Sequence, residues 1–172
     1  MAIRDILLTD NPILRRKSKR VSRFDAHVAG LAADLAETMH SANGLGLAAP
    51  QIGVLLRVIA VELPKDSEEP NAGKLFIMVN PEIAEAKGEQ VGPEGCLSLP
   101  GFWANVKRAN EVVVKARDPK GRQVRLKANG LLARALQHEI DHLDGILFFD
   151  HLSSLQELQP VEKPAAETVG VT

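Results

Sequence analysis

Apolar residues spaced three and four positions apart predict two helices that each bury one face. The first extends from about Asp25, a residue type that caps helix N-termini, to about Ser41, and Asn43-Gly44 ends it. Its buried stripe consists of Val28, Leu31, Ala32, Leu35 and Met39. The second begins after Asn129 and ends at Asp144-Gly145, and its stripe consists of Leu132, Leu136, Ile140 and Leu143.

Runs of β-branched residues and alternating apolar positions predict antiparallel strands between these helices. We expect one hairpin around Lys87-Gly88 and another around residues 118–121. Asn80-Pro81 ends the predicted strand at residues 75–79, which comes before the first hairpin. The last strand buries one face, formed by Val124, Leu126 and Ala128. The predicted strands cover residues 54–61, 75–79, 83–86, 89–91, 112–117 and 123–128.

The remaining segments are polar or rich in glycine, and we predict loops there. Residues 13–21 form a basic surface segment, which we interpret as a solvated face, and residues 44–53 form a glycine-bearing loop. After Leu152 we expect a short helix at residues 153–158 and disorder over the last dozen residues. The pattern indicates an α+β fold: small antiparallel β-sheets around one central helix, with an N-terminal helix and a C-terminal tail.

Composition limits the classes of function. A chain of 172 residues suits one domain with a hydrophobic core. Its formal net charge of -1 gives no electrostatic reason to expect nucleic acid or an anionic membrane as a partner. The N-terminus lacks the apolar region of a signal peptide, and Cys96, the single cysteine, forms no internal disulfide. Both features predict a cytoplasmic protein.

Two histidines in the second predicted helix point to a metal ion. His138 and His142 are four residues apart, so they lie on one helix face, about 40° apart around its axis. Glu139 stands beside that face, where a carboxylate can accept a proton from a metal-activated water without being a ligand. This combination predicts metal-assisted hydrolysis. The alternative is two ordinary histidines in a packed helix.

A catalytic metal site of this kind needs a third protein ligand. The candidates are numerous carboxylates and the side chains of Cys96, His27, His40 and His151. Cys96 stands out because Gly95 permits close backbone approach and residues 97–99 can lie extended along a sheet edge. A metal-bound thiol is deprotonated and is a strong, soft donor. The alternative for a lone cysteine is a small buried hydrophobe.

The glycine-bearing segment at residues 44–53 supplies a polar group of another kind. Gln51 carries an amide that can donate to a developing oxyanion without competing for protons. The segment lacks the third glycine of a dinucleotide-binding loop, and no Gly-Lys-Ser/Thr is present, so we do not expect nucleotide binding. A connector whose glycines serve only turn geometry is the alternative.

Three segments together resemble the peptide deformylase family. The signatures of that family are Gly-x-Gly-x-Ala-Ala-x-Gln, Glu-Gly-Cys-Leu-Ser and Gln-His-Glu-x-Asp-His. Here they stand complete and in the same order at residues 44–51, 94–98 and 137–142. The similarity extends from Asn11-Pro12 to Leu152. It therefore implies one deformylase-like catalytic domain at residues 1–152, followed by the short helix and tail of residues 153–172.

The resemblance implies a role for each chemically active residue. The implied metal ligands are Cys96, His138 and His142. The implied general acid/base is Glu139, and the oxyanion donors are Gln51 and the backbone N–H of Leu97. The implied reaction is removal of the formyl group from the formyl-methionine of newly made polypeptides, with release of formate. The implied cofactor is one divalent metal ion, Fe²⁺ in the cell, with Zn²⁺, Ni²⁺ or Co²⁺ as alternatives in isolated protein.

The resemblance also implies that an extended formylated peptide binds by strand addition between the glycine-bearing segment and the Cys-bearing strand, with its methionine in an apolar pocket. The residues expected at this substrate site are Leu45, Gly46, Gly95, Leu131, Arg134 and Ala135. Arg134 departs from the aliphatic residue often found in the family. Either its stem lines the pocket while its charge reaches solvent, or the pocket has another shape. Trp103 either anchors the sheet or faces the substrate.

Other expectations concern partners and rival functions. Asp141 bonds either a ligand imidazole or one of the arginines. The tail has mixed charge, so direct nucleic-acid binding is not expected and a ribosome contact is doubtful. One rival is a His-Glu-x-x-His peptidase with a different third ligand. The other is a non-catalytic protein with a structural zinc, which would need a fourth protein ligand.

Overall fold

Two antiparallel sheets and two α-helices dominate residues 2–162, the part of the chain that this computed structural model describes. The larger sheet has the order β1-β2-β3-β6-β7. It contains β1 (Gly46–Ala48), β2 (Val58–Glu62), β3 (Leu75–Lys87), β6 (Glu111–Arg117) and β7 (Gln123–Asn129). The smaller sheet has the order β4-β5-β8 and contains β4 (Gln90–Cys96), β5 (Leu99–Arg108) and β8 (Gln159–Pro160). Both β1 and β4 are therefore edge strands.

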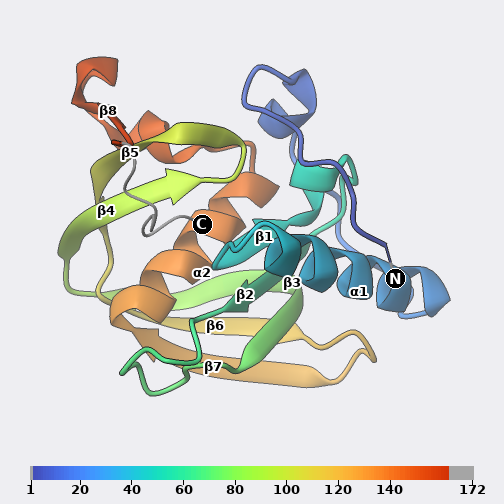
Figure 1. The fold of residues 1–172 in the computed structure, drawn as a ribbon. Coiled ribbons are helices and arrows are strands. Elements are labelled where there is room, and N and C mark those ends of the chain that lie inside the picture. Colours follow the sequence, from blue (N-terminus) through green and yellow to red (C-terminus); the bar gives the residue numbers. More distant parts are fainter. Residues whose placement is uncertain (1, 163–172) are drawn as a thin grey trace.

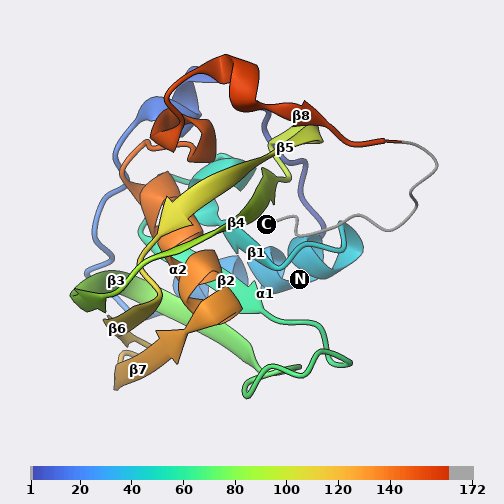
Figure 2. The same ribbon diagram turned by 90° about the vertical axis from the view of Figure 1, so that its left-hand side faces the viewer.

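The two helices lie on different sides of the larger sheet. Figure 1 shows α2 (Gly130–Leu143) in the middle of the molecule, between β4 and the β6–β7 pair, with α1 (Ala26–Ser41) beside β1. The view in Figure 2, turned by 90°, again places α2 between the two sheets. Short 3-10 helices complete the described chain: η1 (Pro12–Arg15), η2 (Ala49–Ile52), η3 (Phe148–His151) and η4 (Leu155–Glu157).

Strand β2 explains how both helices are held. All of its first four residues are buried, because each face of the strand meets a different apolar cluster. Ile59 and Val61 pack into the cluster that contains the α2 stripe, whereas Val58 and Ala60 pack into the cluster that contains the α1 stripe. The central helix is thus fixed against one face of the larger sheet by a continuous core. A third cluster joins the Cys96 end of β4 to η3.

The structure confirms the α+β class and both predicted helices. The Asp25 side chain accepts hydrogen bonds from the N–H groups of His27 and Val28 at the start of α1. Every residue of the two predicted stripes is buried. The predicted hairpin around residues 118–121 is also present, because β6 and β7 pair along their whole length. Among the helices of residues 2–162, none combines the length and apolar composition that crossing a bilayer requires.

The predicted end of a strand at Asn80-Pro81 is wrong. Strand β3 continues through both residues, and a register shift between Val79 and Glu82 accommodates them. Asn80 adopts a left-handed backbone conformation with φ of 53°. Its side-chain amide exchanges two hydrogen bonds with the backbone of Val21, which hold the bulge in place. This long-range support is not visible in the local sequence.

The predicted hairpin around Lys87-Gly88 is also wrong. The end of β3 pairs with β6, where Lys87 stands opposite Glu111, whereas β4 pairs with β5. Gly88 has a φ of 69°, and the chain passes there from one sheet to the other. Lys87-Gly88 is therefore a connection between two sheets and not the turn of a hairpin.

Three other segments differ from the expectation. Within the glycine-bearing segment, Gly46–Ala48 forms an edge strand and Ala49–Ile52 a 3-10 helix. Residues 97–99 do not continue along a sheet edge, because Leu97 and Ser98 form the turn between β4 and β5. The predicted helix at residues 153–158 is one 3-10 turn, and the chain then pairs with β5 as β8. The predicted disorder falls on residues 161–172, of which residues 163–172 lie outside the described residues.

Candidate metal centre

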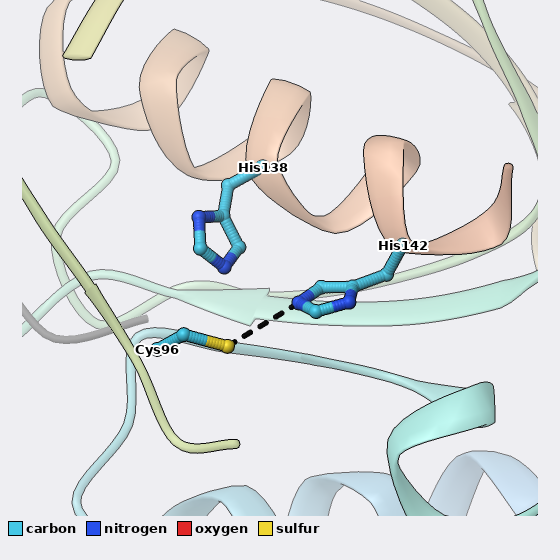
Figure 3. Close-up of side chains that lie close together, drawn as sticks. All are labelled: Cys96, His138 and His142. Carbon is cyan, nitrogen blue, oxygen red and sulfur yellow. Dashed lines mark hydrogen bonds between the residues drawn. The ribbon is translucent and has the colours of Figure 1, made fainter. Parts of the chain in front are cut away.

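Three predicted side chains meet at the inner face of α2. His138 and His142 project from successive turns of the helix, and Cys96 faces them from the end of β4 (Figure 3). One ligand atom from each residue lies within 4.8 Å of the others, and all three residues are buried. The Sγ atom of Cys96 is 3.4 Å from Nε2 of His142. One sulfur and two imidazoles therefore converge on one point inside the protein.

The other candidates for a third ligand lie elsewhere. His27 is exposed at the start of α1. His40 pairs through Nε2 with Glu62 at 2.9 Å, and His151 contacts Asp141 at 2.8 Å. Among residues 2–162, the group of histidine, cysteine and carboxylate side chains close enough to hold one ion consists of Cys96 and the two histidines of α2.

His138 is held in the orientation that a metal ligand requires. Its Nδ1 lies 2.9 Å from Oε1 of the fully buried Glu94, a carboxylate acceptor, so we assign the ring proton to Nδ1. The Nε2 atom has no hydrogen-bond partner among residues 2–162, although it is buried. A buried polar atom is costly without a partner. A cation between this Nε2, the Cys96 sulfur and Nε2 of His142 would provide one, so the donor set fits a divalent transition metal.

Burial and nearby charges shift the pKa values at this centre. Burial alone would raise the pKa of Glu94, but hydrogen bonds from Arg108 and His138 outweigh it, and the pKa lies well below the usual range of a glutamate. Burial lowers the pKa of His142 well below its ordinary value, and the charge of Arg108 lowers it further. Glu94 is thus a carboxylate at neutral pH, and His142 is a neutral imidazole with a lone pair to donate.

Glu139 lies beside the three candidate ligands. Its side chain is fully buried, and neither carboxyl oxygen has a hydrogen-bond partner within residues 2–162. Its Oε2 lies 4.0 Å from Nε2 of His138. Burial raises the pKa of Glu139 to about 7. A carboxyl group with this pKa can both accept and release a proton near neutral pH.

Gly46 explains how Glu139 is accommodated. A Cβ atom added to this glycine would lie 2.5 Å from Oε2 of Glu139, which is closer than real Cβ contacts. The backbone of β1 therefore passes directly over the carboxyl group, and a side chain at this position would require the Glu139 carboxyl group to move. The sequence expectation placed Gly46 at the substrate site; the structure places it against the candidate acid/base.

Gln51 approaches the centre from η2. Its Nε2 donates to Oγ of Ser98 at 3.0 Å and lies 3.6 Å from Sγ of Cys96. Its Oε1 accepts a hydrogen bond from the N–H of Ala48 at 2.9 Å, which fixes the orientation of the amide. Gln51 is fully buried, so its N–H groups point into the site from a rigid position. The amide is placed where it can donate to an oxygen close to Cys96.

A cavity of about 530 Å³ opens beside Cys96, and its lining is largely apolar. Two of the residues expected at the substrate site, Leu45 and Leu131, line it, and so does Leu97. Ala135 is instead fully buried in the core between α2 and the larger sheet. Gly95 stands opposite Trp103 in the β4–β5 pair. Phe102, next to Trp103, lines the cavity and is 43% exposed.

Of the two alternatives for Arg134, the structure contradicts the one in which its charge reaches solvent. Arg134 is buried, and its Nη1 donates to Oε2 of Glu94 at 2.6 Å and to the carbonyl of Val106 at 2.9 Å. The guanidinium group therefore points behind the candidate ligands, toward the smaller sheet. It acts on the centre through Glu94 rather than through the cavity.

Glu94 and Arg108 are the functional residues that sequence reasoning missed. Glu94 opens the Glu-Gly-Cys-Leu-Ser signature, and this position was the available signal for its importance. Arg108 binds Glu94 with Nε and Nη2, both at 2.8 Å, and binds Asp141 with Nη1 at 2.6 Å. Of the two alternatives for Asp141, the structure thus shows the bond to an arginine.

Comparisons with known proteins agree with this geometry. The family described as polypeptide deformylase matches residues 3–158. A peptide deformylase of Thermomicrobium roseum is 51% identical over 169 residues, which cover 98% of this chain and 96% of that protein. The crystal structure of a peptide deformylase from Legionella pneumophila is 46% identical, with a TM-score of 0.83 over 91% of this chain and 89% of that one. A peptide deformylase from Ehrlichia chaffeensis, in complex with actinonin, is 36% identical, with a TM-score of 0.86 over 91% of this chain and 92% of that one.

Proposed function

Since this chain belongs to the peptide deformylase family, we propose that Cys96, His138 and His142 hold its one divalent metal ion. The protein is a hydrolase that removes the N-terminal formyl group from newly synthesised polypeptides. The observation that carries the ligand assignment is the buried convergence of one sulfur and two imidazoles, with Nε2 of His138 left without another partner.

Glu139 moves the proton in the proposed reaction. A divalent ion at this site would supply Lewis-acid polarisation of the formyl oxygen and make water more acidic. Glu139 accepts a proton from the attacking water, and it later gives a proton to the amine nitrogen as the bond to the formyl carbon breaks. Water and the formyl group leave as formate, and the peptide keeps a free amine. The closeness of Glu139 to His138 supports this role.

Gln51 and the backbone N–H of Leu97 stabilise the negative charge that develops on the formyl oxygen. The Gln51 amide is held by Ala48 and Ser98 within 3.6 Å of the Cys96 sulfur, so its nitrogen is fixed beside the proposed metal ligand before the substrate binds. Leu97 follows Cys96 in the turn between β4 and β5 and lines the cavity. Both donors thus stand next to one proposed metal ligand.

The peptide binds as an added strand between the edge strands β1 and β4. Each edge strand leaves one row of N–H and C=O groups without a neighbouring strand of its own sheet. Leu45 and Leu131 line the cavity that would receive the methionine side chain. Gly46 and Gly95 belong to these two edge strands, whereas Ala135 lies in the core and Arg134 bonds Glu94 behind the centre.

Ferrous iron is the proposed native metal, because the family resemblance favours it, and zinc, nickel or cobalt would fill the same donor set. Iron as the native metal implies that activity is lost on aerobic handling and protected when nickel or cobalt replaces it. Equal activity of the zinc and iron forms would contradict this assignment. We also propose a cytoplasmic location, which a reduced thiolate ligand and a nascent-chain substrate both favour.

A metal titration tests the ligand set directly. Metal-free protein should bind one equivalent of Co²⁺ and develop a thiolate-to-cobalt charge-transfer band. Cys96→Ser should remove that band and weaken binding, while His40→Ala, which changes a histidine away from the cluster, should change neither. An undiminished band in the Cys96→Ser protein would overturn the assignment.

A further inference from the structure

An unbroken series of hydrogen bonds connects the surface of the protein with His138. It begins at His151, whose side chain is 36% exposed, and passes from Nε2 to Oδ2 of Asp141 at 2.8 Å. Asp141 Oδ2 accepts from Nη1 of Arg108 at 2.6 Å. Arg108 then binds Glu94, and Oε1 of Glu94 binds Nδ1 of His138 at 2.9 Å. The series therefore ends on the imidazole proposed to ligate the metal.

Arg108 helps to set the position of the Glu94 oxygen that is hydrogen-bonded to His138. Oε1 accepts from Nη2 of Arg108 and from His138, whereas Oε2 accepts from Nε of Arg108 and from Nη1 of Arg134. Arg134 therefore fixes the far oxygen of the carboxylate. The direction of Oε1, and with it the ring of His138, is set by the position of the Arg108 guanidinium.

Asp141 and His151 in turn set the position of Nη1, the Arg108 nitrogen that does not bind Glu94. Nη1 of Arg108 lies 2.6 Å from Oδ2 of Asp141 and 3.3 Å from Nε2 of His151. The same Asp141 oxygen faces the His151 ring, so a proton on Nε2 makes His151 a donor to Asp141. These three groups line a hollow of about 350 Å³ that shares no lining residue with the cavity beside Cys96. His151 can thus hold Asp141 in place without touching the substrate.

We propose that His151 is a positioning residue of the metal centre: it holds Asp141, so that Arg108 and Glu94 keep His138 directed at the metal. This inference rests on the proposed function, in which His138 is a ligand. It extends that function to a side chain on η3, outside the three signature segments. Loss of a partner that orients a metal-bound histidine lowers metal affinity, whereas loss of a surface histidine does not.

The test compares His151→Phe, which removes the ring nitrogens, with His151→Gln, which keeps an N–H donor near the Asp141 oxygen. The readout is the first-order rate at which the Co²⁺-loaded protein loses its metal to excess EDTA. We expect His151→Phe to lose Co²⁺ measurably faster than the wild type, by less than the roughly 10–100-fold found for partners that bond a metal-bound histidine directly. His151→Gln should restore a rate close to that of the wild type, and His27→Phe, an exposed histidine on α1, should not change it.

Two results would overturn the proposal. One is a wild-type rate of Co²⁺ loss in His151→Phe; the other is equal acceleration in His151→Phe and His151→Gln, because the hydrogen bond would then be irrelevant. Thermal unfolding of the metal-free variants identifies any general loss of stability, which the proposal does not predict for His151→Gln. Failure of the wild type to form the cobalt–thiolate band would instead contradict the proposed ligand set, so the two failures are distinguishable.

Discussion

Nδ1 of His138 and Oε1 of Glu94 are joined by a hydrogen bond of 2.9 Å in a region that water does not reach. The carboxylate fixes which ring nitrogen carries the proton and leaves the lone pair of Nε2 facing Cys96 and His142. Such a carboxylate–histidine pair both orients a metal ligand and raises its basicity. The metal affinity of the centre should therefore depend on a residue that never touches the metal.

Substitution of Glu94 by glutamine tests this dependence. We expect Glu94→Gln to lower Co²⁺ affinity by about 10–100-fold, the range found for outer partners of metal ligands. The variant should also unfold more easily, by about 3–5 kcal/mol, because Arg108 and Arg134 lose their buried counter-charge. A matched control is Glu85→Gln, which breaks an exposed pair with Arg125. Wild-type metal affinity in a folded Glu94→Gln protein would contradict the expectation.

Gly46→Ala should displace the Glu139 carboxyl group, since the added Cβ would lie 2.5 Å from Oε2. Catalysis depends steeply on such placement, and a shift of about 1 Å can cost about 100-fold in rate. We therefore expect a loss of kcat of this order in a formate-release assay, with one metal per chain retained. Gly30→Ala is the control, because nothing lies within 4 Å of a Cβ at that position of α1. Equal kcat values for the two variants would rule out the packing argument.

Gln51→Ala should lower kcat by about 10²–10³-fold, the usual cost of removing one oxyanion donor. KM should change less, because the donor acts mainly on the charge of the transition state. Ser98→Ala distinguishes chemistry from positioning: it removes the hydrogen bond of 3.0 Å that orients the amide but keeps the amide itself. The decrease in kcat of Ser98→Ala should therefore be smaller than that of Gln51→Ala. Steady-state kinetics with a formyl-Met peptide provide the measurement, and an unchanged kcat in Gln51→Ala would remove Gln51 from the mechanism.

The pair formed by Arg15 and Asp150 predicts a pH-dependent contribution to stability. Burial alone would raise the pKa of Asp150, but hydrogen bonds from Arg15 and from the Leu147 backbone lower it. A lowered pKa means that the contribution is fully present above the pKa of an unfolded aspartate, about 3.9, and is lost as the pH falls from there through the lower pKa of the folded state. Asp150→Asn should thus reduce the free energy of unfolding by about 1 kcal/mol at pH 7.

Urea unfolding at pH 7 and pH 3 measures this difference. The gap between wild type and Asp150→Asn should be smaller at pH 3 than at pH 7, because the unfolded aspartate is largely protonated at pH 3. Arg15→Gln combined with Asp150→Asn completes a double-mutant cycle that isolates the pair. A gap of the same size at both pH values would show that packing around η3, rather than the charge, is responsible.

The sequence predicted correctly the helices whose apolar residues recur at regular spacing. The α2 stripe, its end at Asp144-Gly145 and the α1 cap at Asp25 depend on residues close together in the chain, and the sequence predicted them. The metal cluster was predictable for the same reason, because two of its three members share one helix face. Cys96 was predictable from its glycine-bearing context and the family signature.

The errors arose where distant contacts decide the structure. Asn80 keeps β3 continuous through bonds to Val21, 59 residues away in the chain. Gly88 looks like a hairpin turn, yet the chain there passes between sheets whose partners come from later residues. Arg134 was expected at the substrate site because the family resemblance places that position there. Its actual partner, Glu94, lies 40 positions earlier and could not be inferred from the helix alone.

Catalysis depends most on Glu139, the group that moves the proton beside a metal held by Cys96, His138 and His142. The direct measurement is formate release from a formyl-Met tripeptide by anaerobically metal-loaded wild type and Glu139→Gln, with metal content determined in the same samples. We predict one metal per chain in both proteins and a rate about 10²–10⁴-fold lower in Glu139→Gln. A fully metal-loaded Glu139→Gln protein that releases formate at the wild-type rate would contradict it.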